Sequence, residues 1–204
     1  MRFHFLFLFA LLSLPGMAQT AFDQQIEDHR EHYKAEFLST KSSPLPSQEA
    51  VSLLRFYPAD SAYRVTATVT RTPGSAPVDF PTSMANRTAS EAPYATLSFT
   101  INGKPCRLTV YRSLGLANNP MYRDYLFLPF TDATTGQETY GGGRYLDLRT
   151  GQIQNGTLVL DFNKAYNPYC AYKSGYACPI PPAANRLAVA IKAGERTYGG
   201  AHQD

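Results

Sequence analysis

The sequence is poor in the side chains on which many catalytic sites depend. Its 204 residues contain no tryptophan, three cysteines and four histidines. Apart from His4 near the start, the histidines are His29, His32 and His202, so none lies in the central part of the chain. A serine or cysteine nucleophile needs a neighbouring base. Triad chemistry is therefore not expected.

Catalytic and nucleotide-binding motifs are also missing. The sequence has no GxSxG, HExxH, P-loop or dinucleotide fingerprint. The glycine run 141–143 does not predict a phosphate cradle, because a strand and not a helix is expected after it. A formal net charge of +3, with scattered basic residues, argues against a nucleic-acid partner. His29 and His32 lack a further ligand nearby, so neither a metal nor another cofactor is predicted.

Residues 1–18 have the features of a secretory signal peptide. One arginine precedes an apolar run from Phe3 to Leu14, and Gly16 and Ala18 have the spacing of a cleavage site. The alternative, an uncleaved anchor, is disfavoured because the apolar run is short. We expect cleavage after Ala18 and an exported chain, periplasmic or extracellular, with no membrane span.

The rest of the chain, 19–204, has the length of one domain. Its first part, 23–54, is predicted to be helical, and its body, 56–198, to be rich in strands. Between Asp23 and Leu38, apolar residues recur at helical spacing among charged neighbours, with His29 and His32 expected on a solvated face. Ser47 is placed to cap a short second helix through Leu54.

The body predicts a succession of strands separated by turns. The strands are expected at Tyr63–Thr70, Tyr94–Ile101, Lys104–Tyr111, Tyr125–Phe130, Arg144–Leu148, Thr157–Phe162 and Leu187–Ile191. Residues 72–93, which hold several prolines, predict a long loop. Pro129 favours an edge or a bulge for its strand. The pattern is typical of a mainly β single domain, an antiparallel β-barrel or β-sandwich with N-terminal amphipathic helices.

The clearest local prediction is a hairpin at Asn102-Gly103, because both turn positions favour positive φ. A two-residue turn sets Phe99 opposite Cys106 and Leu97 opposite Leu108. Cys106 then shares a face with these apolar residues, so it is expected on the core side.

The stretch from Glu138 to Pro182 stands out by composition. It holds six of the fourteen tyrosines and two of the three cysteines. Rigid phenols among glycines and prolines are typical of a shaped surface. In an exported chain, Cys170 and Cys178 predict a disulfide.

Several polar residues in and near this stretch have no evident structural duty. They are Tyr140, Arg144, Asp147, Asp161, Asn163, Tyr166, Asn167, Asn185 and Glu195. One interpretation is capping of strand ends and turns. The other gathers them around a pocket, where Arg144 binds an anion or pairs with a buried carboxylate.

The pocket interpretation leads to two functional classes. The first is a binding module that holds a small ligand in a tyrosine-rich polar pocket, which needs no catalytic base. The alternative is a carboxylate-dependent hydrolase with Asp161 and Glu195 as candidate catalytic residues.

Three strings carry a family resemblance. They are ETYGGGRYLDL at 138–148, LDFNKAYNPYCAY at 160–172 and CPIPPAANRLAVAIKAGE at 178–195. Together with weaker matches at 43–45, 56–65 and 126–136, they resemble the bacterial family known as domain of unknown function 1684. This resemblance implies a shared fold over nearly the whole exported chain, but no activity.

Overall fold

The computed structural model describes residues 15–204, with side chains from Gln19 onward. The apolar run of the predicted leader lies outside the described residues. The helices and strands are α1 (Pro15–Ser39), α2 (Gln48–Ser52), β1 (Arg64–Arg71), β2 (Val78–Pro81), β3 (Thr88–Ile101), β4 (Lys104–Ser113), β5 (Tyr125–Phe130), β6 (Arg144–Arg149) and β7 (Thr157–Asp161).

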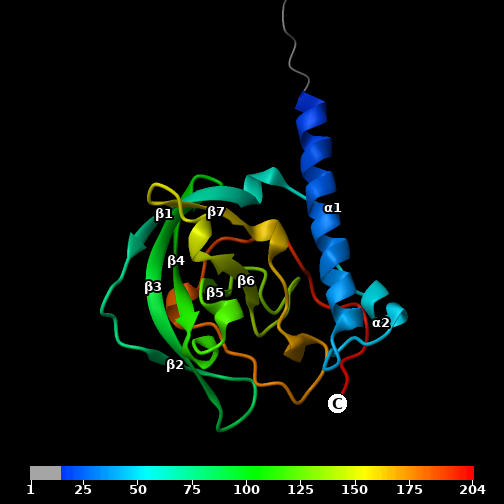
Figure 1. Ribbon diagram of the computed structural model, residues 1–204. Helices are drawn as coiled ribbons and strands as arrows, with labels where there is room; N and C mark the ends of the chain where they lie inside the picture. The colour runs from blue at the N-terminus through cyan, green and yellow to red at the C-terminus, as the bar shows by residue number, and fades with distance from the viewer. Residues whose placement is uncertain (1–14) are drawn as a thin grey trace, which may run out of the picture.

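The strands form one seven-stranded antiparallel sheet. Its order is β6-β5-β4-β3-β1-β7, and β2 pairs with β3 beside this path. The sheet curls strongly, so that it resembles half of a barrel, and α1 stands beside it on the side nearest β6 and β7 (Figure 1). The predicted mainly β, antiparallel fold with helices at the N-terminal end is confirmed. The two ends of this path are the edge strands β6 and β7.

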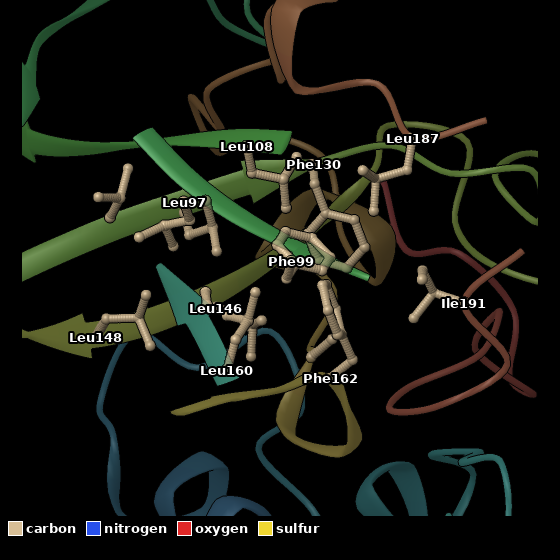
Figure 2. Close-up of a cluster of buried hydrophobic side chains, with 14 of the residues drawn as sticks. Leu97, Phe99, Leu108, Phe130, Leu146, Leu148, Leu160, Phe162, Leu187 and Ile191 are labelled. Carbon is tan, nitrogen blue, oxygen red and sulfur yellow. The ribbon is translucent and has the colours of Figure 1, made fainter. Parts of the chain in front are cut away.

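The main hydrophobic core fills the concave face of the sheet. Alternate residues of the strands point inward, as the two-residue period of a strand requires. Figure 2 shows Leu97, Leu146 and Leu160 meeting Phe99 and Phe162 in this cluster. Most of these side chains are fully shielded from solvent, so burial of apolar surface is the main source of stability.

The hairpin has the register that the sequence predicts. Phe99 pairs with Cys106 and Leu97 with Leu108. Asn102 and Gly103 both have positive φ, at 49° and 74°. Cys106 is partly buried, packs against the main core and is not in a disulfide.

The prediction of a long loop over 72–93 is wrong. This segment contains β2 and the first part of β3. Its prolines are tolerated because Pro81 is the last residue of β2, and because the β3–β4 register shifts between Pro93 and Ala95. Strand pairing over the rest of the segment therefore overrides its turn-like composition.

The predicted strand Leu187–Ile191 is wrong as well. Leu187, Val189 and Ile191 are buried, which agrees with the alternating pattern. However, the segment does not join the sheet: its backbone bonds to the turn after β5, with Leu187 N donating to Thr131 O and Ala133 N donating to Val189 O. It closes one end of the half-barrel as irregular chain.

Pro129 was expected to place its strand at an edge or a bulge. β5 instead lies inside the sheet, between β4 and β6. Its ladder with β4 consists of a single pair, Tyr111 with Phe127. Pro129 follows that pair, where the ladder with β4 has already ended, so its missing N–H costs no sheet bond.

α1 begins at Pro15, earlier than predicted, and therefore includes the predicted cleavage site. A single stripe of the helix, Phe22, Ile26 and Phe37, is buried, while Leu38 is exposed. Phe37 belongs to a second, smaller cluster with residues of α2 and of the segment after β7. Ser47 caps α2 by accepting a bond from Ala50 N, as predicted.

Candidate functional site

A cavity of about 830 Å³ lies between α1, the two edge strands and the segment 164–179. This volume is within the range of about 300–1,000 Å³ that is usual for small-molecule sites. Aromatic rings from distant parts of the chain line it: Tyr33, Phe56, Tyr122, Tyr145, Tyr166, Tyr169 and Tyr176. The half-barrel opens at β6 and β7, so α1 and this segment enclose space that a closed barrel would lack.

Asp147 reaches the cavity because of the alternation along β6. Leu146 and Leu148 are buried in the core, so Tyr145 and Asp147 lie on the opposite face. The Oδ1 atom of Asp147 accepts two phenol hydrogen bonds, from Tyr125 at 2.8 Å and from Tyr166 at 2.7 Å. Within the described chain, its Oδ2 atom has no hydrogen-bond partner.

The pKa of Asp147 is raised because the surrounding protein disfavours its charge, and this effect outweighs the hydrogen bonds from Tyr166 and Tyr125 and the positive charge of Arg149. The guanidinium of Arg149 is engaged elsewhere, with Asp124 at 2.8 Å and Met121 O at 3.0 Å. Water can nevertheless reach the carboxylate, since the side chain is exposed to the cavity. Asp147 is thus accessible but has no bonded cation.

A second group of charges lies where α1 meets β1 and β7. Arg64 is 3.8 Å from Asp161, between Nε and Oδ2, and Lys164 lines the same cavity. Both His29 and His32, expected on a solvated face, line the cavity, but His29 is half-buried there while His32 is exposed. Burial, followed by the charge of Lys164, lowers the pKa of His29. This imidazole is therefore uncharged at neutral pH.

Among the predicted site residues, Asp161, Asn163 and Tyr166 line the cavity, together with Asp147. Asp161 and Asn163 also serve local structure. Asp161 Oδ1 accepts from Asn163 N at 3.1 Å and Nδ2 at 2.9 Å, and Asn163 Nδ2 also donates to Asp60 O at 2.8 Å. Both interpretations of these two residues, capping and pocket lining, thus agree with their positions.

The other predicted residues do not line the cavity: Tyr140, Arg144, Asn167, Asn185 and Glu195. Tyr140 donates to the carbonyl of Cys170 at 3.2 Å. This bond ties the glycine-rich turn to the disulfide segment and leaves the phenol outside the cavity wall.

Arg144 is completely buried and pairs with a buried carboxylate, the second of its two predicted roles. Its Nη2 atom lies 2.9 Å from Asp132 Oδ2, and both side chains are fully shielded. It also donates to the carbonyls of Ile191, Ala193 and Glu195. The guanidinium thus anchors the irregular C-terminal segment to the end of β6 and presents no surface to a ligand.

Asn185 bridges β4 and β5. Its Oδ1 accepts from Thr109 N at 2.8 Å, and its Nδ2 donates to Thr109 O at 2.8 Å and to Pro129 O at 2.7 Å. This amide replaces the ladder bonds that β4 and β5 do not form beyond Phe127.

Glu195 is a buried acid that lies behind the cavity wall. Its carboxylate accepts from Tyr172 at 2.7 Å, from Tyr33 at 3.1 Å and from Asn167 N at 2.9 Å. Burial raises its pKa to about 7. Tyr33 lines the cavity and Glu195 does not, so the phenol separates this acid from the cavity.

The chain reaches this position because of Gly194. Its φ is 75°, and a Cβ atom there would lie 2.6 Å from the carbonyl oxygens of Phe162 and Ala165. Only glycine allows this approach, and Glu195 N then donates to Ala165 O at 2.8 Å.

Cys170 and Cys178 form the predicted disulfide. The loop between them supplies Tyr176 and Ala177 to the cavity wall, together with Cys178 itself.

Within the described residues, no group of three or more His, Cys, Asp or Glu side chains is placed to hold a metal ion. No helix in 15–204 is long and apolar enough to cross a bilayer.

Sequence reasoning missed the residues that come from outside the tyrosine-rich stretch. Tyr33 and His29 lie on α1, Arg64 lies on β1, and only the tertiary fold brings them to β6 and β7. Asp147 is among the polar candidates that the sequence offers, and its direction is also indicated, because a lone acid between two buried leucines of a strand must face away from the core.

Comparison with known proteins agrees with the resemblance found in the sequence. The model of the family described as protein of unknown function (DUF1684) matches residues 50–196. The fold is similar to the solution NMR structure of an uncharacterised protein of Haloarcula marismortui, with 36% identity, a TM-score of 0.66, and coverage of 89% of this chain and 97% of that one. No curated protein matches the chain. The chain therefore belongs to the DUF1684 family.

Proposed function

We propose that this protein is a binding module that holds a small organic ligand in the aromatic cavity. The observation that carries the proposal is a cavity of about 830 Å³ in which a carboxylate oxygen of Asp147 is accessible among tyrosine rings. Apolar walls with a few placed polar groups are the usual composition of small-molecule sites.

The walls are held in place before any ligand binds. The ring of Tyr166 contacts those of Tyr33 and Tyr145, with centroids 6.0 Å and 5.9 Å apart. Tyr169 and Tyr176 contact each other at 5.2 Å across the disulfide loop. A preformed aromatic surface loses little conformational entropy on binding.

A carboxylate-dependent hydrolase is the second candidate. It is favoured by Asp161, which lines the cavity with His29, an uncharged imidazole at neutral pH. The predicted partner acid, Glu195, lies behind Tyr33, so Asp147 is the acid that shares the cavity with Asp161. Product formation from a bound compound, abolished by Asp161→Asn while binding is retained, would favour the hydrolase.

A matched pair of valines tests the binding proposal. Val159 on β7 lines the cavity and is 51% exposed, whereas Val78 on β2 is 44% exposed and lies outside it. In a thermal-shift screen of small organic compounds, Val159→Trp should abolish the shifts that ligands produce, because the indole occupies the cavity. Val78→Trp should keep them. Equal shifts in both variants, or no shift in the original chain, would overturn the proposal.

We also propose that the chain is exported, on the strength of the leader pattern in 1–18; the disulfide is compatible with this. Mass spectrometry of periplasmic or secreted material should find an N-terminus at Gln19. An intact Met1 in that material would contradict cleavage.

A further inference from the structure

We propose that the ligand of this cavity carries one ammonium group, primary or quaternary, which sits against Asp147 beside the rings of Tyr145 and Tyr166. This inference rests on the proposed binding function and names the class of ligand.

The first support is the unequal use of the two oxygens of Asp147. Both phenols, Tyr125 and Tyr166, donate to Oδ1. A carboxylate oxygen has more than one acceptor site, so Oδ1 alone can serve both phenols. Oδ2 is therefore left to accept a bond from a ligand. The phenols stay protonated, since burial raises the pKa of each, and so they hold the carboxylate as donors over the whole physiological range.

The second support is the charge of the site. Among the described residues, the positive charge of Arg149 lowers the pKa of Asp147, but its guanidinium donates to Asp124 and to Met121 O and not to Asp147. It also lies over the Tyr125 ring, with 5.7 Å to the centroid. A negative charge that is accessible, disfavoured by its surroundings and without a bonded cation among the described residues is complemented by a cation.

The third support is the geometry of the rings. Tyr145 and Tyr166 pack edge to face, with an interplanar angle of 89° and centroids 5.9 Å apart, so they form one perpendicular aromatic corner. Tyr145 lies on the same face of β6 as Asp147, and the hydroxyl of Tyr166 binds the carboxylate. Ring faces attract alkylated ammonium groups through the cation–π interaction.

The cavity also limits the number of positive charges on the ligand. Arg30, Arg64 and Lys164 line the part that faces α1 and β7, together with two acids, Asp161 and Glu36, so the basic groups are in excess there. A second ammonium group on the ligand would meet repulsion there, and a monocation is therefore preferred over a dication.

Titration calorimetry of the full chain with matched probes tests the proposal. The probes are n-butylammonium and tetramethylammonium, the neutral n-butanol, the anion butyrate, and the dication of diaminobutane. Butylammonium should bind about tenfold or more tightly than butanol, since a charged hydrogen bond is involved. Butyrate should bind most weakly, and the dication more weakly than butylammonium.

Two variants with the same charge change complete the test. Asp147→Asn keeps an oxygen for the two phenols but loses the charge, so its affinity for butylammonium should fall to that for butanol. Asp79→Asn removes an exposed carboxylate on β2, outside the cavity, and should bind as the original chain does.

In the original chain, cation affinity should decline as pH falls through the raised pKa of Asp147, and the Asp147→Asn variant should lack this decline.

The outcomes separate the two proposals. If butanol and butylammonium bind equally and Val159→Trp abolishes both, the binding function stands and the ammonium inference fails. Unchanged cation affinity in a folded Asp147→Asn variant would also overturn the inference. If none of the probes and none of the compounds in the wider screen binds, both proposals fail.

Discussion

The side-chain amide of Asn185 donates to the carbonyl of Pro129 at 2.7 Å and so joins two strands whose backbones do not pair at this level. The same amide exchanges two further bonds with Thr109. A residue that the sequence could assign to a pocket thus completes the sheet.

Replacing Asn185 with leucine should lower the free energy of unfolding by about 3 kcal/mol, because three buried hydrogen bonds of about 1 kcal/mol each are lost. Asn118→Leu, at an exposed position, is the control and should change stability by about 0.5 kcal/mol or less. Urea unfolding of both variants provides the comparison. Equal stability of the two variants would show that the bridge is dispensable.

Arg144→Met should destabilise the fold strongly. Removing one partner of a buried ion pair leaves Asp132 uncompensated, which costs about 3–5 kcal/mol. Arg107→Met, on the exposed side of β4, should be nearly neutral. Chemical denaturation measures both. A stable Arg144→Met protein that loses ligand binding would instead assign this arginine to the site.

Stability should fall as pH rises from about 4.5 to about 7. Burial raises the pKa of Glu195, and likewise that of Glu91, from 4.5 to about 7 in the folded chain. Between these pH values the folded chain keeps protons that the unfolded chain releases. For each acid, the free energy of unfolding therefore falls by up to about 3 kcal/mol as the pH rises from about 4.5 to about 7.

The test is the slope of unfolding free energy against pH. Glu195→Gln and Glu91→Gln should each remove part of the slope, and the exposed Glu49→Gln should leave it unchanged. A slope of opposite sign in the original chain, or no effect of either buried variant, would contradict the raised pKa values.

The thiols should differ in reactivity. Alkylation in denaturant without reductant should label Cys106 alone, because Cys170 and Cys178 are bonded to each other. Replacing both bonded cysteines with serine should lower stability by about 2.5 kcal/mol, as expected for a short closed loop. Mass spectrometry counts the labels, and label on all three cysteines would refute the pairing.

The local features of this fold could be predicted from the sequence because they depend on neighbouring residues. Asn102-Gly103 fixes the hairpin register, and Ser47 caps α2. The pairing of β2 with β3 is local, but the prolines and small polar residues of this segment indicate a loop. The irregular path of 187–191 could not be predicted, since it depends on backbone partners at Thr131 and Ala133, far along the chain.

The site was predicted only in part for the same reason. Asp161, Asn163 and Tyr166 line the cavity, but Arg144 and Asn185 use the same kinds of polar atoms to hold the fold. Residue type alone does not separate these roles. The contribution of α1 depends on how the helix packs, which its helical spacing does not reveal.

The location of ligand binding is the central claim, and amide proton–nitrogen correlation spectra test it most directly. The chain would be titrated with the compound that gives the largest thermal shift. The account predicts that the amide signals of Tyr33, Asp147 and Tyr166 move together with one dissociation constant, while those of β2 stay in place. Saturable shifts confined to β2, or to any surface away from the cavity, would contradict it.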